Sequence, residues 1–149
     1  MTTRLGRVQK MIESGQSPMA IASLLGFSIK SVQSGEAVIE FEMTADHTNT
    51  MGTLHGGVFC TIADTAMGVA FYTMLEENES LATLELKINY LKPVWNGKLL
   101  AKGKVIKKGR STGFVECNVM DENDELVAHA NSTYMVLSDD QAKNRYVPD

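Results

Sequence analysis

The hydrophobic residues follow a helical period at the start of the chain. Apolar side chains at helical spacing are Leu5, Val8, Met11 and Ile12. This spacing predicts a short amphipathic helix that ends at Gly15. Ser17 followed by Pro18 is typical of an N-cap and a first helical position, so we expect a second short helix that ends at Gly26.

The period changes to two residues from Glu36 onward. Alternation runs through residues 36–42, with Ala37, Ile39 and Phe41 on one face. This pattern predicts a half-buried strand. A polar segment over residues 44–54 follows and is expected to form a loop.

A long apolar helix is predicted from the pair Gly56-Gly57 onward. Its apolar residues lie on nearly every side and are Val58, Phe59, Ile62, Ala63, Met67, Val69, Phe71 and Met74. A helix that is apolar all round is expected to be buried all round. The apolar run over residues 58–75 is long enough to suggest a membrane span, but Asp64 near its middle and the glutamates at 76, 77 and 79 argue against one.

Further strands are predicted after residue 80, separated by turn residues. Their ranges are 84–90, 99–108, 112–120 and 126–137. Because tight turns join antiparallel neighbours, the order of elements predicts an α+β fold in which a curved antiparallel sheet wraps around one central helix. We expect a single domain over residues 1–149, with a helical extension at about 1–26 and a loose polar tail at about 138–149.

The composition agrees with one globular domain and narrows the range of partners. The chain has 149 residues, of which 44% are hydrophobic and 21% charged, and a formal net charge of -4. This balance argues against nucleic acid as a partner, because phosphate binding requires a basic surface. Cys60 and Cys117 are far apart and have no CxxC pattern, and the first residues lack an apolar signal-peptide core. We therefore expect a soluble protein in the cytoplasm.

Asp64 is the anomaly in the long helix. A carboxylate among apolar residues is costly unless it is hydrogen-bonded, so it is either a structural group with a nearby donor or a functional one. Eight residues earlier, at Gly56 and Gly57, the helix begins with backbone N–H groups that have no intrahelical acceptor. Such amides can stabilise an oxyanion, and a carboxylate together with an oxyanion site is what hydrolysis of an acyl bond requires.

Several segments resemble one known family. Asn49, the run His55-Gly56-Gly57 and Asp64 resemble the signature of hotdog-fold thioesterases, in particular the phenylacetate-pathway (PaaI-type) group. The segments 83–93, 108–110 and 114–117 are also similar to that group, so the resemblance extends over residues 30–137. It implies a hotdog fold and the activity of an acyl-CoA thioesterase.

The resemblance also implies a role for individual residues. The Gly56 N–H would polarise the thioester carbonyl, with support from Asn49. Asp64 would act as a general base on water or as a nucleophile that forms an acyl-enzyme anhydride. Thr83 would help to hold the water, and His55 would orient the loop and the glycine turn. Each residue also has a structural interpretation: Asn49 as a turn residue, His55 as a helix cap and Thr83 as a strand residue.

Substrate contacts are expected at five further positions. Gly57 would let the thioester approach the backbone closely, and Lys108 and Arg110 would meet the CoA phosphates, although such a basic cluster is more often a solvated turn. Phe59 and Met67 could line a pocket for a medium-chain or aromatic acyl group, or could simply pack in the core.

Two chains are expected to share each active site. Gly56 and Asp64 are eight residues apart, or roughly 12 Å along one helix. One carbonyl carbon cannot contact both, whereas two antiparallel helices of a dimer would bring Gly56 of one chain to Asp64 of the other. The resemblance implies further assembly into a dimer of dimers.

Other functions remain as alternatives. A non-catalytic acyl-CoA-binding sensor with this fold would be expected to lack the carboxylate, and hydroxyacyl-thioester dehydratases of the same fold also pair a His with a carboxylate. His47, His55 and His129 lack the spacing of a metal site, and no nucleotide-binding glycine pattern occurs. We therefore expect no metal and no cofactor.

Overall fold

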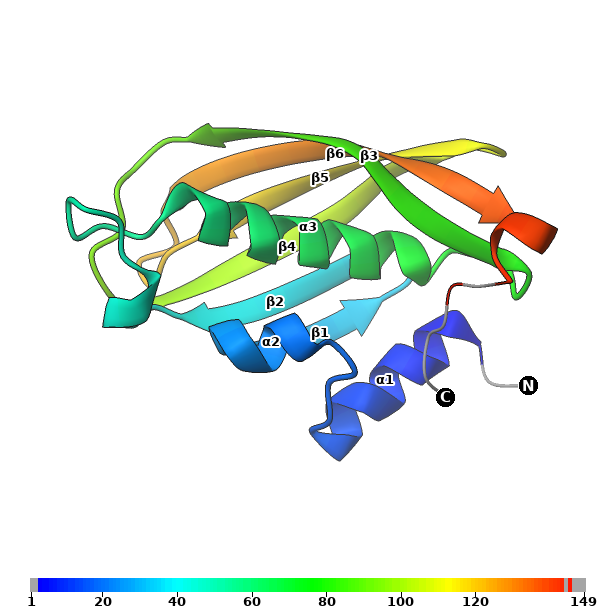
Figure 1. Ribbon diagram of the computed structural model, residues 1–149, viewed down its shortest axis with the longest axis horizontal. Coiled ribbons are helices and arrows are strands. Elements are labelled where there is room, and N and C mark those ends of the chain that lie inside the picture. The colour runs from blue at the N-terminus through cyan, green and yellow to red at the C-terminus, as the bar shows by residue number, and fades with distance from the viewer. Residues whose placement is uncertain (1–2, 144, 146–149) are drawn as a thin grey trace.

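A curved antiparallel sheet holds one long helix against its inner face (Figure 1). The computed structural model describes residues 3–143 and 145. The strands are β1 (Phe27–Gln33), β2 (Glu36–Glu42), β3 (Glu79–Tyr90), β4 (Lys98–Lys108), β5 (Thr112–Met120) and β6 (Leu126–Ser138). The helices are α1 (Arg4–Ser14), α2 (Ala20–Leu25) and α3 (Gly56–Tyr72), with short 3-10 helices η1 (Ala45–His47) and η2 (Asp139–Gln141).

The strand order is β1-β2-β4-β5-β6-β3, and every neighbouring pair is antiparallel. After the β1–β2 hairpin, the chain crosses the sheet through α3 to β3 at the far edge. It then returns to β4 beside β2, and the meander β4–β5–β6 ends against β3. The α+β architecture predicted by the sequence is therefore confirmed.

The predicted starts and ends of several elements agree with the structure. Helix α1 ends at Gly15, whose φ of 66° is left-handed, and α3 begins at Gly56. In β2 the alternate residues Ala37, Ile39 and Phe41 are buried, as the period of two predicts. The inward-facing residues of β5 follow the same rule.

Strand β1 is not predicted by the sequence pattern. Phe27 and Ile29 alternate as a strand requires, but the register shifts between Ile29 and Ser31. This bulge brings Val32 opposite Ala37, so no continuous period of two runs through the strand. Antiparallel pairing with β2 holds this segment in the sheet although its residues do not alternate regularly.

Two local predictions were wrong. Helix α2 begins at Ala20 with Met19 as its N-cap, because the Ser17 hydroxyl accepts a hydrogen bond from the Met19 amide in a turn before the helix. Strand β3 begins at Glu79 and not at residue 84 as predicted, and Leu84 lies at a bulge between Thr83 and Glu85 inside it, where it is 52% exposed.

Burial of α3 on all sides was also an incorrect expectation for the single chain. The side chains packed against the sheet are buried, and these are Phe59, Ile62, Ala63, Ala66, Met67, Ala70 and Phe71. The opposite face is only partly covered, as at Asp64, Thr65 and Val69. Met74 follows the helix and is 36% exposed. One sheet can cover only one side of a helix.

The C-terminal tail was predicted to be loose from about residue 138. Strand β6 continues to Ser138 and η2 follows it, so the predicted tail begins with ordered backbone. The rest of that prediction, at residues 144 and 146–149, lies outside the described residues.

Between residues 3 and 143, no helix has the length and apolar character needed to cross a membrane.

The α3 backbone lies directly on β4 because Gly103 has no side chain. A Cβ atom at Gly103 would come within 2.5 Å of the Ala66 carbonyl oxygen and 2.8 Å of the Met67 amide nitrogen. Gly113 on β5 has a similar function, since a Cβ atom there would meet the Phe71 ring at 2.1 Å. Glycine at these positions therefore determines how closely the helix approaches the sheet.

We expect Gly103→Ala to lower the free energy of unfolding by about 3 kcal/mol, because backbone atoms cannot make room for the added methyl group. Gly68→Ala is the matched control, since its Cβ would lie 3.7 Å from the Tyr134 hydroxyl, an ordinary contact. Because alanine favours the helix more than glycine does, Gly68→Ala should raise the free energy of unfolding by up to about 1 kcal/mol. Urea unfolding of both variants measures the two effects, and equal stabilities would contradict the packing argument.

Candidate active site

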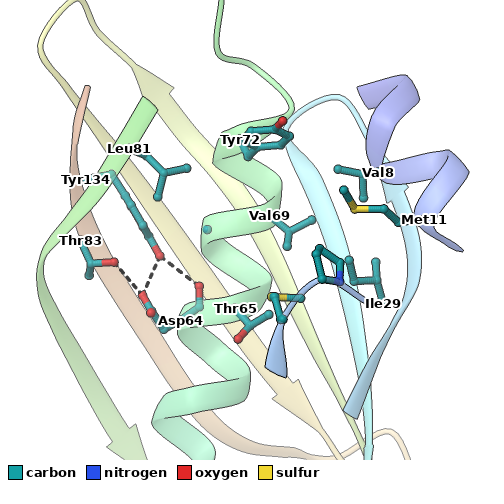
Figure 2. A pocket seen from close by; sticks show the side chains of 13 residues that line it. Val8, Met11, Ile29, Asp64, Thr65, Val69, Tyr72, Leu81, Thr83 and Tyr134 are labelled. Atoms are coloured by element: carbon teal, nitrogen blue, oxygen red, sulfur yellow. Dashed lines mark hydrogen bonds between the residues drawn. The ribbon is translucent and has the colours of Figure 1, made fainter. Parts of the chain in front are cut away.

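Asp64 occupies the middle of α3, and its half-buried side chain points toward Thr83 on β3 and Tyr134 on β6 (Figure 2). Its Oδ1 atom accepts two hydrogen bonds, from the Thr83 hydroxyl at 3.1 Å and from the Tyr134 hydroxyl at 2.9 Å. None of the hydrogen bonds made by residues 3–143 reaches the other carboxylate oxygen, Oδ2. One oxygen is thus held in place while the second can accept a proton.

Tyr134 is a site residue that the sequence reasoning missed. It lies on β6, is 0% exposed and stacks on Phe71 with ring centroids 5.4 Å apart. Burial, and then the charge of Asp64, raise the pKa of its hydroxyl well above the ordinary value, so it remains a neutral donor. The available signal was its inward-facing position in β6, since a buried tyrosine hydroxyl needs a polar partner.

The β3 bulge gives Thr83 its position beside Asp64. The register of β3 against β6 shifts between Thr83 and Glu85. Bulges commonly redirect a side chain next to a functional site. The hydroxyl of Thr83 consequently points at the carboxylate from the edge strand (Figure 2).

The start of α3 has one occupied and one unoccupied backbone N–H. His55 is the N-cap, and its Nδ1 atom accepts a hydrogen bond of 2.9 Å from the Gly57 amide. The Gly56 amide donates to no acceptor within the described part of the chain. Tyr90 donates to the Gly56 carbonyl at 3.0 Å, and a Cβ atom on Gly56 would lie 2.9 Å from the Tyr90 hydroxyl oxygen. His55 therefore caps the helix and leaves the Gly56 amide available.

Asn49 stabilises its own turn and also borders the start of α3. Its Oδ1 atom accepts hydrogen bonds from the amides of Met51 and Thr53, and its Nδ2 atom donates to the Thr53 hydroxyl at 2.8 Å. A cavity of about 390 Å³ is lined by Asn49, Gly56 and Tyr90, among others. The second hydrogen on Nδ2 can still be donated to a group in that cavity.

Asp64 borders a different cavity, of about 300 Å³, which is mostly apolar. It lies between α1, α3, β1 and β3, and Thr83 and Tyr134 also line it (Figure 2). Within one chain, the structure therefore groups Asp64 with Thr83 and Tyr134, and Gly56 with Asn49. It does not bring Asp64 and Gly56 to a common cavity.

The expected substrate-binding residues are dispersed. Lys108 pairs with Glu79 at 3.0 Å, and Arg110 is exposed in the turn after β4. Burial would raise the pKa of Glu79, but hydrogen bonds from the Glu76 amide and Lys108 outweigh it and lower the pKa. The remaining three lie on α3. Gly57 is exposed in the first turn, and its amide donates to His55. Phe59 borders the Gly56 cavity, and Met67 is 0% exposed against the sheet.

Comparisons with known proteins identify the family to which the chain belongs. The profile of the thioesterase superfamily matches residues 51–128. A 1,4-dihydroxy-2-naphthoyl-CoA hydrolase from Listeria monocytogenes is 30% identical over 118 residues, which cover 79% of this chain and 96% of that protein.

Solved structures show the same fold. A variant of the phenylacetic acid degradation protein PaaI from Thermus thermophilus superposes with a TM-score of 0.75 at 28% identity, covering 80% of this chain and 100% of the other. The thioesterase HI1161 from Haemophilus influenzae superposes with a TM-score of 0.80 at 23% identity, covering 98% and 96%, a likeness of fold. The chain therefore belongs to the thioesterase superfamily and is a thioester-hydrolysing enzyme with the hotdog fold.

Proposed function

We propose that this protein hydrolyses the thioester of a medium-chain or aromatic acyl-CoA to the free acid and CoA. The observation that carries the proposal is the state of Asp64. One of its oxygens is held by two hydroxyl donors, and the other has no hydrogen-bond partner among the described residues and lies beside an apolar cavity. An apolar cavity suits the acyl group, and a free carboxylate oxygen suits a water molecule next to its carbonyl.

In the general-base route, Asp64 takes a proton from water while the water oxygen bonds to the thioester carbonyl carbon. The negative charge that develops on the carbonyl oxygen is stabilised by the free N–H of Gly56, with the Asn49 amide as a second donor. The C–S bond then breaks, and the departing thiolate takes the proton from Asp64. In the nucleophilic route, Asp64 attacks the carbonyl carbon, the C–S bond breaks and CoA leaves as its thiolate. Water then hydrolyses the anhydride, which gives the acid, regenerates the Asp64 carboxylate and supplies the proton that the thiolate takes up. Both routes use the same groups.

The reaction needs Gly56 and Asp64 at one carbonyl carbon, so we propose that each site combines residues from two copies of the chain. Strand β3 forms an edge of the sheet, and its exposed apolar side chains include Leu84 and Tyr90, at 52% and 53% exposure. An exposed apolar edge of this kind is normally covered. Two-fold pairing along β3 would cover it and set the two α3 helices antiparallel, with two equivalent sites. Further assembly into a dimer of dimers is part of the same proposal.

Asp64→Asn is expected to lower kcat/KM for acyl-CoA by at least about 1,000-fold, because the amide cannot accept the proton from water. The control is Asp124→Asn, at an exposed turn residue whose φ of 60° suits asparagine. Release of free CoA thiol measures both. Full activity in a folded Asp64→Asn protein would contradict the assignment, and binding of acyl-CoA without hydrolysis by the wild type would favour the sensor alternative.

Thr83→Val and Tyr134→Phe are each expected to lower kcat/KM about tenfold, because each removes one donor to the same oxygen of Asp64 while keeping the shape of the side chain. The double variant should lose less than the product of the two, since both donors act on one atom. Tyr134→Phe keeps the ring that stacks on Phe71, so the fold should persist. Independent, fully multiplicative losses would argue against joint orientation of the carboxylate.

Mixed dimers test the shared site. Gly56→Pro removes the amide hydrogen and also adds atoms near Tyr90. Gly56→Ala adds a similar contact with Tyr90 but keeps the hydrogen, so comparing the two variants separates loss of the amide donor from crowding at Tyr90. We expect Gly56→Pro and Asp64→Asn to be inactive alone and to recover part of the activity when refolded together, because some dimers then contain one intact site. Differently tagged chains show whether hybrids form. Inactive hybrids, or an active wild-type monomer, would contradict a shared site.

A further inference from the structure

Part of the wall of the Asp64 cavity comes from outside the sheet and α3. Val8 and Met11 of α1 line it, together with Pro18 and Met19 of the segment between α1 and α2 (Figure 2). Asp64 and its hydrogen-bond donors line the same cavity from α3, β3 and β6. The N-terminal extension is therefore a structural part of the site and not a separate appendage.

Arg4 attaches α1 to the end of α3. Its Nη1 atom donates to the Tyr72 hydroxyl at 2.9 Å, and its guanidinium lies 4.8 Å from the centroid of the Tyr72 ring. Its Nη2 atom donates to the carbonyl oxygens of Glu77 at 2.9 Å and Glu79 at 2.8 Å. One side chain thus joins the first turn of α1 to the last turn of α3 and to the start of β3. A planar guanidinium is suited to several such bonds at once.

Helix α1 depends on these contacts for its position. It has 11 residues, and a helix of that length is marginal in water without packing. Val8 is its buried residue, at 3% exposure, while Met11 is half-buried at the cavity. The position of α1, and with it the depth of the cavity, therefore rests on Arg4, on the packing of Val8 and on the 3.0 Å ion pair between Arg7 and Glu77.

The size of the cavity limits what it can hold. At roughly 30 Å³ for each carbon atom, close to the volume of one water molecule in the liquid, about 300 Å³ accommodates on the order of ten carbon atoms. Since Asp64 borders the cavity, an acyl chain whose carbonyl carbon lies at Asp64 would extend past Val69 toward Met11. A longer chain in the same direction would meet Val8 and Met11 of α1.

We propose that α1, held by Arg4, is the wall that limits acyl length, and that Met11 and Val8 restrict the enzyme to acyl groups of about eight to ten carbon atoms. This inference rests on the proposed thioesterase function and adds the specificity-determining residues. Arg4 acts as a positioning residue, because it contacts α3 and β3 and not the acyl group.

The test is the chain-length profile of two substitutions at Met11. In the wild type, kcat/KM for saturated acyl-CoA is expected to rise by about fourfold per methylene group and to stop rising near ten carbons. Met11→Trp fills the cavity and should move this limit to a shorter chain by two or more carbons, and Met11→Ala should move it to a longer one. The control Lys10→Trp adds the same indole at an exposed position of α1 and should leave the profile unchanged.

Binding of free saturated fatty acids, measured by titration calorimetry, separates this inference from the proposed function. If the wild type hydrolyses no acyl-CoA, the proposed function fails. A shift in the longest fatty acid that binds, between the wild type and the Met11 variants, would still support α1 as the wall that limits acyl length. If the wild type is active but neither Met11 variant moves the limit in hydrolysis or binding, although both are folded, the inference is overturned. Binding of none of the fatty acids overturns it as well.

Arg4→Gln tests the attachment, with Lys10→Gln as control. Faster hydrogen exchange over residues 4–14 is expected, together with a KM for decanoyl-CoA that rises about tenfold while kcat stays within about twofold. A merely structural role would lower the amount of folded protein without this split between KM and kcat. Faster exchange with an unchanged chain-length profile would refute the role of Arg4.

Discussion

The close approach of the α3 backbone to the sheet is the constraint on which the rest of the structure depends. It is possible because Gly103 and Gly113 lack side chains where the helix and Phe71 rest. A methyl group at either position would lift the helix away from β4 or β5. The height of α3 over the sheet in turn decides whether Asp64 lies within hydrogen-bond distance of Tyr134, which comes from the sheet itself.

The geometry around Asp64 shows how a fold can tolerate a carboxylate in an apolar helix. Two hydroxyl donors compensate one oxygen, and the cavity leaves the other free. Burial keeps the Tyr134 hydroxyl protonated, so this donor is retained across the pH range in which a thioesterase works. The same arrangement that satisfies Asp64 structurally also holds it in one orientation, which is what a proton-accepting group requires.

In the proposed mechanism, three separate parts of the molecule have to meet at one acyl group. The carboxylate lies at the middle of α3, the free Gly56 amide lies at its start, and the apolar wall comes from α1. Rigid helix geometry keeps the first two apart within one chain, so a second copy is the simplest way to join them. Arg4 joins this wall to the end of the same helix, away from Asp64 and its two hydroxyl donors.

The sequence by itself determined the local elements and the residues that carry a family signature. Periodicity located α1 and most strands, the apolar run after Gly56 located α3, and an isolated carboxylate in that run marked Asp64, because these signals depend on neighbours a few positions away. Only the tertiary structure decided the role of Tyr134, which is 70 residues from Asp64, and the pairing of the bulged strand β1. It also decided that Met67 is a core residue at the sheet while Met11 lines the cavity. Contacts of this kind depend on where the chain returns in space, which no local pattern of residues specifies.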